Sequence, residues 1–157
     1  EFEPLYHAAA QSLSALGTGS SSGTVVRLRA LSKLLVWQAW IASEGGDQGK
    51  AELQESLALL ERPELVGVDT RSERAFVLSV MVRFAFHPEY EQTKKAAQES
   101  LKLYESLGDR DGMALLLENW GLAAGRYGVL DEGVNFIQKP FSMKNLAAKV
   151  RDVLDSN

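Results

Sequence analysis

The side chains of this chain that could carry out chemistry are few and far apart. His7 and His87 are its two histidines, and it contains no cysteine. Neither histidine has a second ligand at the spacing that zinc sites use, and without cysteine there is no thiolate site or disulfide. His87 precedes Pro88, which is typical of a turn. The sequence therefore predicts no metal ligand and no metal.

The sequence also lacks the motifs that are typical of phosphate binding and of catalysis by a nucleophilic serine. The tract Gly-Thr-Gly-Ser-Ser-Ser-Gly at residues 17–23 resembles a phosphate-binding loop only in composition. Such a loop follows a strand and ends in Lys-Ser or Lys-Thr, so a flexible linker is the simpler interpretation. There is no Gly-x-Ser-x-Gly elbow, and Glu52, Glu55 and Glu61 fall on the polar side of a predicted helix. We expect no catalytic residue, no cofactor and no enzyme.

The composition of the chain limits the kinds of partner that it is expected to bind. The chain has 157 residues, 45% hydrophobic and 24% charged, with a net charge of -4 and no basic tract. Nucleic acid is therefore a disfavoured partner. The strongly apolar run at residues 34–42 is too short to span a bilayer, and no secretory signal is visible. The chain opens at Glu1-Phe2 without Met. We expect a cytoplasmic fragment of a longer protein, or a chain with a cloning scar.

Helical spacing dominates the chain. Apolar residues recur at three- and four-residue steps, with stops at Gly45-Gly46, Pro63 and Gly108. Large aromatics dominate buried contacts, so Trp37, Trp40 and Trp120 are expected in the core. The segment 134–137 could be a strand. The predicted helices cover residues 5–16, 24–44, 47–62, 71–86, 89–107, 109–125 and 142–154.

A short amino-acid sequence that occurs twice in the chain predicts its architecture. Gln-Glu-Ser-Leu begins at Gln54 and again at Gln98, 44 positions later. Each copy precedes a polar break and then a long apolar helical stretch. A period of this size is typical of helix-pair repeats, whose units bury apolar faces only against their neighbours. The predicted fold is all-α, a right-handed solenoid of about three helix pairs.

The middle of the chain resembles tetratricopeptide (TPR)-like repeats, over residues 24–133. The resemblance is carried by Ser-Leu-Gly-Asp-Arg at 106–110, Asn-Trp-Gly-Leu-Ala-Ala at 119–124 and Gly128. In that family a small residue at the position of Gly121 lets two helices approach closely. Met81 and Gly133 depart from the family pattern. The resemblance implies a scaffold that binds a protein or peptide, of the kind found in large bacterial regulators.

The tail resembles the end of a two-component receiver domain, over residues 127–154. The matching residues run from Tyr127 through Lys139-Pro140 into the last predicted helix. In that family the position of Lys139 contacts a phosphoryl group. A receiver also needs an acidic pair and a phosphorylatable aspartate on earlier strands, which are not predicted here. We therefore expect the tail to act as a cap on the repeats.

These predictions combine into a domain plan and a binding surface. Residues 1–23 form an N-terminal helix and linker, 24–133 the repeats, and 134–157 the capping tail. The first helices of stacked pairs line the concave side, and an exposed apolar surface there indicates an interface. The predicted groove residues are Val36, Trp40, Leu78, Val82, Phe86, Glu118, Leu122 and Arg126.

The favoured function is a non-catalytic protein-protein interaction module of a larger bacterial regulatory or signalling protein. A peptide or helix is expected in the groove, and the groove also allows a weak homodimer. Two alternatives remain open. The chain could be a receiver-like fragment of a sensor kinase, which requires a parallel sheet, or an artificial fusion joined near Gly128.

Overall fold

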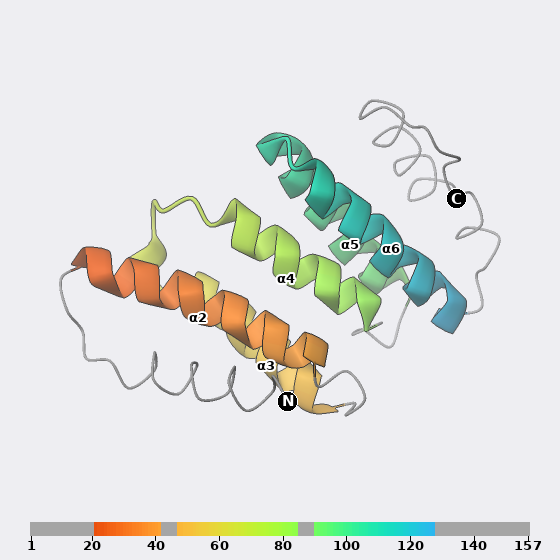
Figure 1. The fold of residues 1–157 in the computed structure, drawn as a ribbon, viewed down its shortest axis with the longest axis horizontal. Coiled ribbons are helices and arrows are strands. Elements are labelled where there is room, and N and C mark those ends of the chain that lie inside the picture. Colours follow the sequence, from red (N-terminus) through yellow and green to blue (C-terminus); the bar gives the residue numbers. More distant parts are fainter. Residues whose placement is uncertain (1–20, 42–46, 85–89, 128–157) are drawn as a thin grey trace. The chain divides into compact units, whose positions relative to one another are not determined.

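Every element of the described chain is a helix. The structure, a computed structural model, describes residues 21–41, 47–84 and 90–127, and these ranges contain no strand. The all-α prediction is confirmed for this part of the chain, while the solenoid arrangement stays a prediction. The elements (Figure 1) are α2 (Ser21–Ile41), α3 (Asp47–Leu60), the 3₁₀ helix η1 (Pro63–Leu65), α4 (Arg71–Arg83), α5 (Tyr90–Leu107) and α6 (Arg110–Tyr127).

Several predicted features fall outside these ranges: the first helix at 5–16, the candidate strand at 134–137 and the last helix at 142–154. Within the ranges, α2 begins at Ser21, so the last three residues of the predicted linker are helical. Serine and glycine are tolerated there because the first N–H groups of a helix lack intrahelical partners anyway. The short helix η1 was not predicted. No helix in the described ranges is long and apolar enough to cross a bilayer.

The chain divides into two compact units, residues 1–77 and 78–157. The division falls inside α4, whose first half belongs to the first unit and whose second half belongs to the second. Each unit is described separately below.

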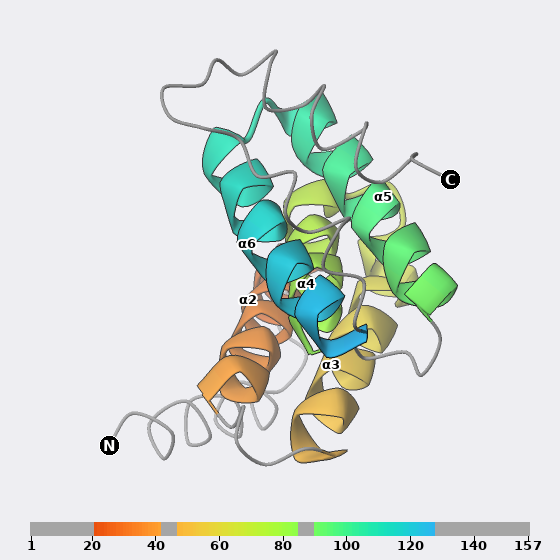
Figure 2. The same cartoon turned by 90° about the vertical axis from the view of Figure 1, so that its right-hand side faces the viewer.

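In the first unit α2 packs along α3 (Figures 1 and 2). The stripe predicted on α2 is buried, and it comprises Leu28, Leu31, Leu35 and Ala39. Gly49 of α3 lies next to α2, and a Cβ there would be in ordinary van der Waals contact with Ala39, 3.4 Å from its carbonyl oxygen. The hydroxyls of Ser32 and Ser56 are 2.8 Å apart, which satisfies two buried polar groups across the pair.

In the second unit α5 packs along α6 (Figure 2), and the turn between them is two residues long. Gly108 has a φ of 65°, and its N–H donates to the Glu105 carbonyl while the Asp109 N–H donates to Tyr104. This is a Schellman ending. The Asp109 carboxylate then accepts the Gly112 N–H at 2.9 Å and caps α6. Gly108 was predicted as the stop, and that prediction is confirmed.

The repeated sequence lies in one helix of each unit. Ser56 lies in α3 and Ser100 lies in α5, and both are fully buried. A small polar residue in each copy therefore faces the interior of its own unit. Leu101, two turns before the end of α5, is buried as well. Its counterpart Leu57 is half-buried, so the serine is the position of the repeated sequence that is buried in both copies.

Candidate functional site

Three of the predicted groove residues form one exposed stripe on α6. Glu118, Leu122 and Arg126 follow each other at four-residue steps, which places them on nearly the same side of the helix. The side chain of Glu118 is 65% exposed, Leu122 is 44% exposed, and Arg126 is exposed as well. We call these three residues the α6 stripe.

Polar contacts hold both ends of the α6 stripe against the last turn of α4. Arg83 Nη1 lies 3.5 Å from Glu118 Oε1 and 3.4 Å from the side-chain oxygen of Asn119. Arg126 Nη1 donates to the Arg83 carbonyl oxygen at 2.6 Å. The last carbonyls of a helix have no intrahelical donor, so this contact satisfies one of them. Leu122 is the apolar residue between the two held charges.

The rest of the predicted groove is mostly interior, which corrects the prediction for three residues. Val36, Leu78 and Val82 are buried, so they cannot be walls of an open groove. The buried residues of α4 run continuously over positions 77–82, and a helix that is apolar all round is enclosed rather than open. Trp40 is half-buried, and Phe86 lies outside the described ranges.

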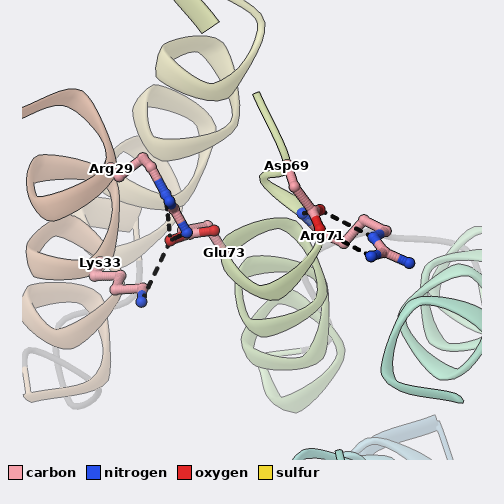
Figure 3. A network of polar contacts seen from close by, with 5 residues as sticks. All are labelled: Arg29, Lys33, Asp69, Arg71 and Glu73. Atoms are coloured by element: carbon pink, nitrogen blue, oxygen red, sulfur yellow. Dashed lines mark hydrogen bonds and ion pairs between the residues drawn. The ribbon is translucent and has the colours of Figure 1, made fainter. Parts of the chain in front are cut away.

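A buried carboxylate joins α4 to α2 in the first unit. Glu73 is 1% exposed, and its Oε1 lies 2.8 Å from Arg29 Nη2 and 3.3 Å from Lys33 Nζ (Figure 3). Arg29 Nε also donates to this oxygen at 2.9 Å. Glu73 Oε2 is buried without a hydrogen-bond partner among the described residues. Two cations therefore face one carboxylate, and both share a single oxygen.

A second ion pair lies at the start of α4, on the surface. Arg71 Nη2 is 2.8 Å from Asp69 Oδ2, and the Arg71 Nε and backbone N–H donate to Asp69 Oδ1. The side-chain hydrogen bonds from Arg71, followed by the backbone one, lower the pKa of Asp69 from 3.8 to about 2. Asp69 was one of two predicted caps for this helix, and the N–H contact bears that out. Figure 3 shows both ion pairs together.

An exposed tryptophan continues the cationic side of α2. Trp37 is 43% exposed, and its ring centroid is 5.5 Å from Phe76 and 6.1 Å from Trp40. The prediction that Trp37 lies in the core is therefore only partly correct. With Val26, Arg29 and Lys33 it forms a line of residues at steps of three and four on one side of α2. We call these four residues the α2 stripe.

The second unit has a buried polar centre below the α6 stripe. Asn119 is fully buried, and its amide donates to the Ser79 backbone oxygen at 3.0 Å and to the Ser79 hydroxyl at 3.2 Å. Burial raises the pKa of Tyr104 to about 12, opposed by a hydrogen bond with Ser79. Ser79 thus joins residues from α5 and α6. A buried hydrogen-bond network whose members all have partners favours one arrangement of the core side chains.

Aromatic residues pack near the end of α6. The Tyr90 ring lies 5.5 Å from both Trp120 and Tyr127, and the hydroxyls of Tyr127 and Thr93 are 2.8 Å apart. Trp120 is buried, so its predicted place in the core is confirmed. The indole N–H of Trp120 has no acceptor among the described residues.

Two features of these surfaces were missed by sequence reasoning. Glu73 is an acid between Arg71 and Arg74, and it precedes the apolar residues predicted on this helix, which begin at Leu78. The pair Arg29 and Lys33, one turn apart on the neighbouring helix, was the available signal for a shared acidic partner. The exposure of Trp37 had no such signal, because an aromatic residue beside an apolar stripe fits a core equally well.

The described residues have dispersed acidic side chains. They include no cluster of three or more His, Cys, Asp and Glu that could hold a metal ion, and His7, His87 and Lys139 lie outside the described ranges. In the α6 stripe, the exposed charges of Glu118 and Arg126 flank the exposed Leu122. Comparison with protein-family models, with curated proteins and with solved structures gives no match for this chain.

Proposed function

We propose that the chain is a non-catalytic protein-protein interaction module of a larger bacterial regulatory or signalling protein, built from TPR-like helix pairs. It recognises a peptide or helix of a protein partner. The observation that carries the proposal is the α6 stripe, where Leu122 is exposed between Glu118 and Arg126.

The α6 stripe has the composition of a small recognition surface. An exposed leucine alone would be ordinary, because apolar atoms contribute much of every protein surface. Here the leucine is flanked by an acid and a base that are already held by Arg83. Prearranged side chains lose less conformational freedom on binding, which favours affinity. The flanking charges also supply orientation, because each prefers an opposite charge on the partner.

The proposal predicts that Leu122→Asp abolishes capture of a protein partner. The full chain, carrying an affinity tag, is immobilised and exposed to an extract of the organism that encodes it. The charge at position 122 would have to be desolvated against the partner's apolar side chain, which opposes binding. Captured proteins are compared by mass spectrometry between the wild type and the variant.

The matched control is Val66→Asp, an equivalent change at an exposed apolar residue that follows η1 in the first unit and is not part of the α6 stripe. We expect this variant to capture the same proteins as the wild type. Equal capture by wild type and Leu122→Asp would contradict the proposal, as would a wild-type chain that captures nothing above the level of the empty support.

A further inference from the structure

We propose that the α2 stripe is a second recognition surface, and that it binds an acidic segment of a protein partner. This surface lies in the first unit, whereas the proposed function rests on the α6 stripe of the second unit. Its distinguishing feature is a positive charge that is not compensated within the unit and that lies between two exposed apolar side chains.

One buried acid holds the two cations of the α2 stripe in place. Arg29 and Lys33 extend from α2 to Glu73 (Figure 3), and both contact its Oε1 atom. Their side chains are nevertheless 38% and 50% exposed. An arginine has five N–H donors and a lysine has three, and one carboxylate oxygen cannot accept from all of them. The two side chains therefore present further donors to solvent from fixed positions, which favours binding of an anionic group.

The charges around the α2 stripe leave a positive surplus. The carboxylate of Glu73 compensates one of the two cations. Two further acids, Glu64 and Asp69, interact electrostatically with cations of α2, but each already forms an ion pair with a nearby arginine. The helix α2 itself contains no acidic residue, and it has a third cation, Arg27. An acidic side chain of a partner is therefore the complement of this surface.

Exposed apolar side chains lie on both sides of the two cations. Val26 is 65% exposed and lies about one turn before Arg29. Trp37 lies about one turn after Lys33, and its exposed ring packs against two other aromatic rings. The order along the α2 stripe is therefore apolar, cation, cation, apolar. A partner that covers both apolar ends removes water from the cations, which strengthens their attraction to an acid.

The small size of the surplus favours a protein over a nucleic acid or an anionic membrane. Affinity for nucleic acid grows with the number of phosphates that the protein neutralises, and attraction to an anionic membrane grows with the number of cations near its surface. The chain as a whole has a net charge of -4, which opposes both. An acidic side chain between two apolar ones matches the charge of the stripe and its two ends.

Fluorescence anisotropy of a labelled peptide tests the inference on the full chain. The α2 stripe runs for about 16 Å along the helix, so the probe is a helical peptide with two leucines about three turns apart and two glutamates between them on the same face. We expect a dissociation constant on the order of 0.1 mM, because the stripe is much smaller than a standard interface. Binding should weaken as salt is added. A control peptide with lysine in place of each glutamate is expected not to bind.

Lys33→Gln removes the surplus charge of the stripe and leaves Glu73 paired with Arg29. The variant is expected to bind the acidic peptide about tenfold more weakly, because one charge-assisted contact is lost. Its control is Lys102→Gln, the same change at an exposed lysine of α5, which is expected to bind as the wild type does.

Val26→Asp is a second variant, which leaves Glu73 and both of its cations unchanged. It places an acid inside the stripe, so it is expected to weaken binding of the acidic peptide as well. Val66→Asp, the same change at an exposed valine that is not part of the stripe, is expected to bind normally. Circular dichroism checks that each variant folds.

Three results would overturn the inference: a wild type that does not bind the acidic peptide, equal binding of the acidic and control peptides, or equal binding by Lys33→Gln and Lys102→Gln. Tighter binding of a short oligothymidine or of phosphatidylserine vesicles, lost in Lys33→Gln, would assign the stripe to a nucleic acid or a membrane and would also overturn it. The proposed function fails on a different result, equal capture by the wild type and Leu122→Asp, so the two failures are distinguishable.

Discussion

At the residue scale, the contribution of an ion pair to the stability of this chain depends on whether the pair is buried or exposed. Glu73 is withdrawn from water and held by Arg29 and Lys33, whereas Asp69 and Arg71 pair at the surface. A buried ion pair is costly to break because the remaining charge is left without compensation. A surface pair contributes little by comparison. The two pairs therefore predict different responses to substitution.

Glu73→Gln is expected to lower the free energy of unfolding by about 1–3 kcal/mol. The substitution keeps the shape of the side chain, removes its charge and leaves Arg29 and Lys33 facing each other. Chemical denaturation measures the change. The control is Glu55→Gln, the same substitution at an exposed carboxylate of α3, which is expected to have no measurable effect. Equal effects at the two positions would mean that Glu73 is not the shared partner of the two cations.

The Asp69–Arg71 pair predicts a pH dependence at acid pH. The pKa of Asp69 is lowered from 3.8 to about 2 in the folded chain. A carboxylate with a depressed folded pKa contributes stability above its unfolded pKa, and that contribution is lost as the pH falls. The thermal midpoint of the wild type should therefore exceed that of Asp69→Asn near neutral pH, and the difference should shrink between pH 4 and pH 2. A difference that stays constant down to pH 2 would contradict the assignment.

At the element scale, the sequence predicted where the helices form but not which of their faces are buried. The five α-helices begin within three residues of their predicted starts because three- and four-residue spacing, glycine stops and caps act locally. The same periodicity cannot say how many faces of a helix are covered. Val36, Leu78 and Val82 were placed on an open wall, yet they are buried. The positions on α6 were predicted by the same groove placement, and they are exposed because two of the three, Glu118 and Arg126, are charged and resist burial.

Close helix crossings depend on neighbours that the sequence does not reveal. Gly121 was singled out by family resemblance, and Gly112 was not. In the structure Gly112 meets the ring of Tyr104, so a Cβ at this position would overlap that ring. Gly49 has more room, because its Cβ would be in ordinary contact with Ala39.

Gly112→Ala is therefore expected to destabilise the second unit by about 1–3 kcal/mol, the usual cost of overpacking. Gly49→Ala, the same change in the first unit, is expected to be neutral or stabilising, because alanine favours helix by about 1 kcal/mol over glycine. Thermal unfolding followed by circular dichroism compares them. A Gly112→Ala chain as stable as Gly49→Ala would show that the Tyr104 ring moves aside without cost.

At the scale of the whole molecule, the described part of the chain is a set of helices, two of which carry exposed stripes. Its two units each have a helix pair and a buried polar contact of their own, Ser32–Ser56 in one and Ser79–Asn119 in the other. Each unit also presents one stripe in which an apolar side chain lies a turn away from a charge. The proposed role as an interaction module depends on these stripes contacting another protein.

Site-specific photo-crosslinking tests that central claim most directly. A benzophenone amino acid replaces Leu122 in the full chain inside cells, and a second variant carries it at Val66, which is exposed outside both stripes. We predict that irradiation gives a covalent protein adduct at position 122 and none at position 66, and that mass spectrometry identifies the partner as a second copy of the chain or another protein. No adduct at position 122, or the same adducts at both positions, would contradict the account.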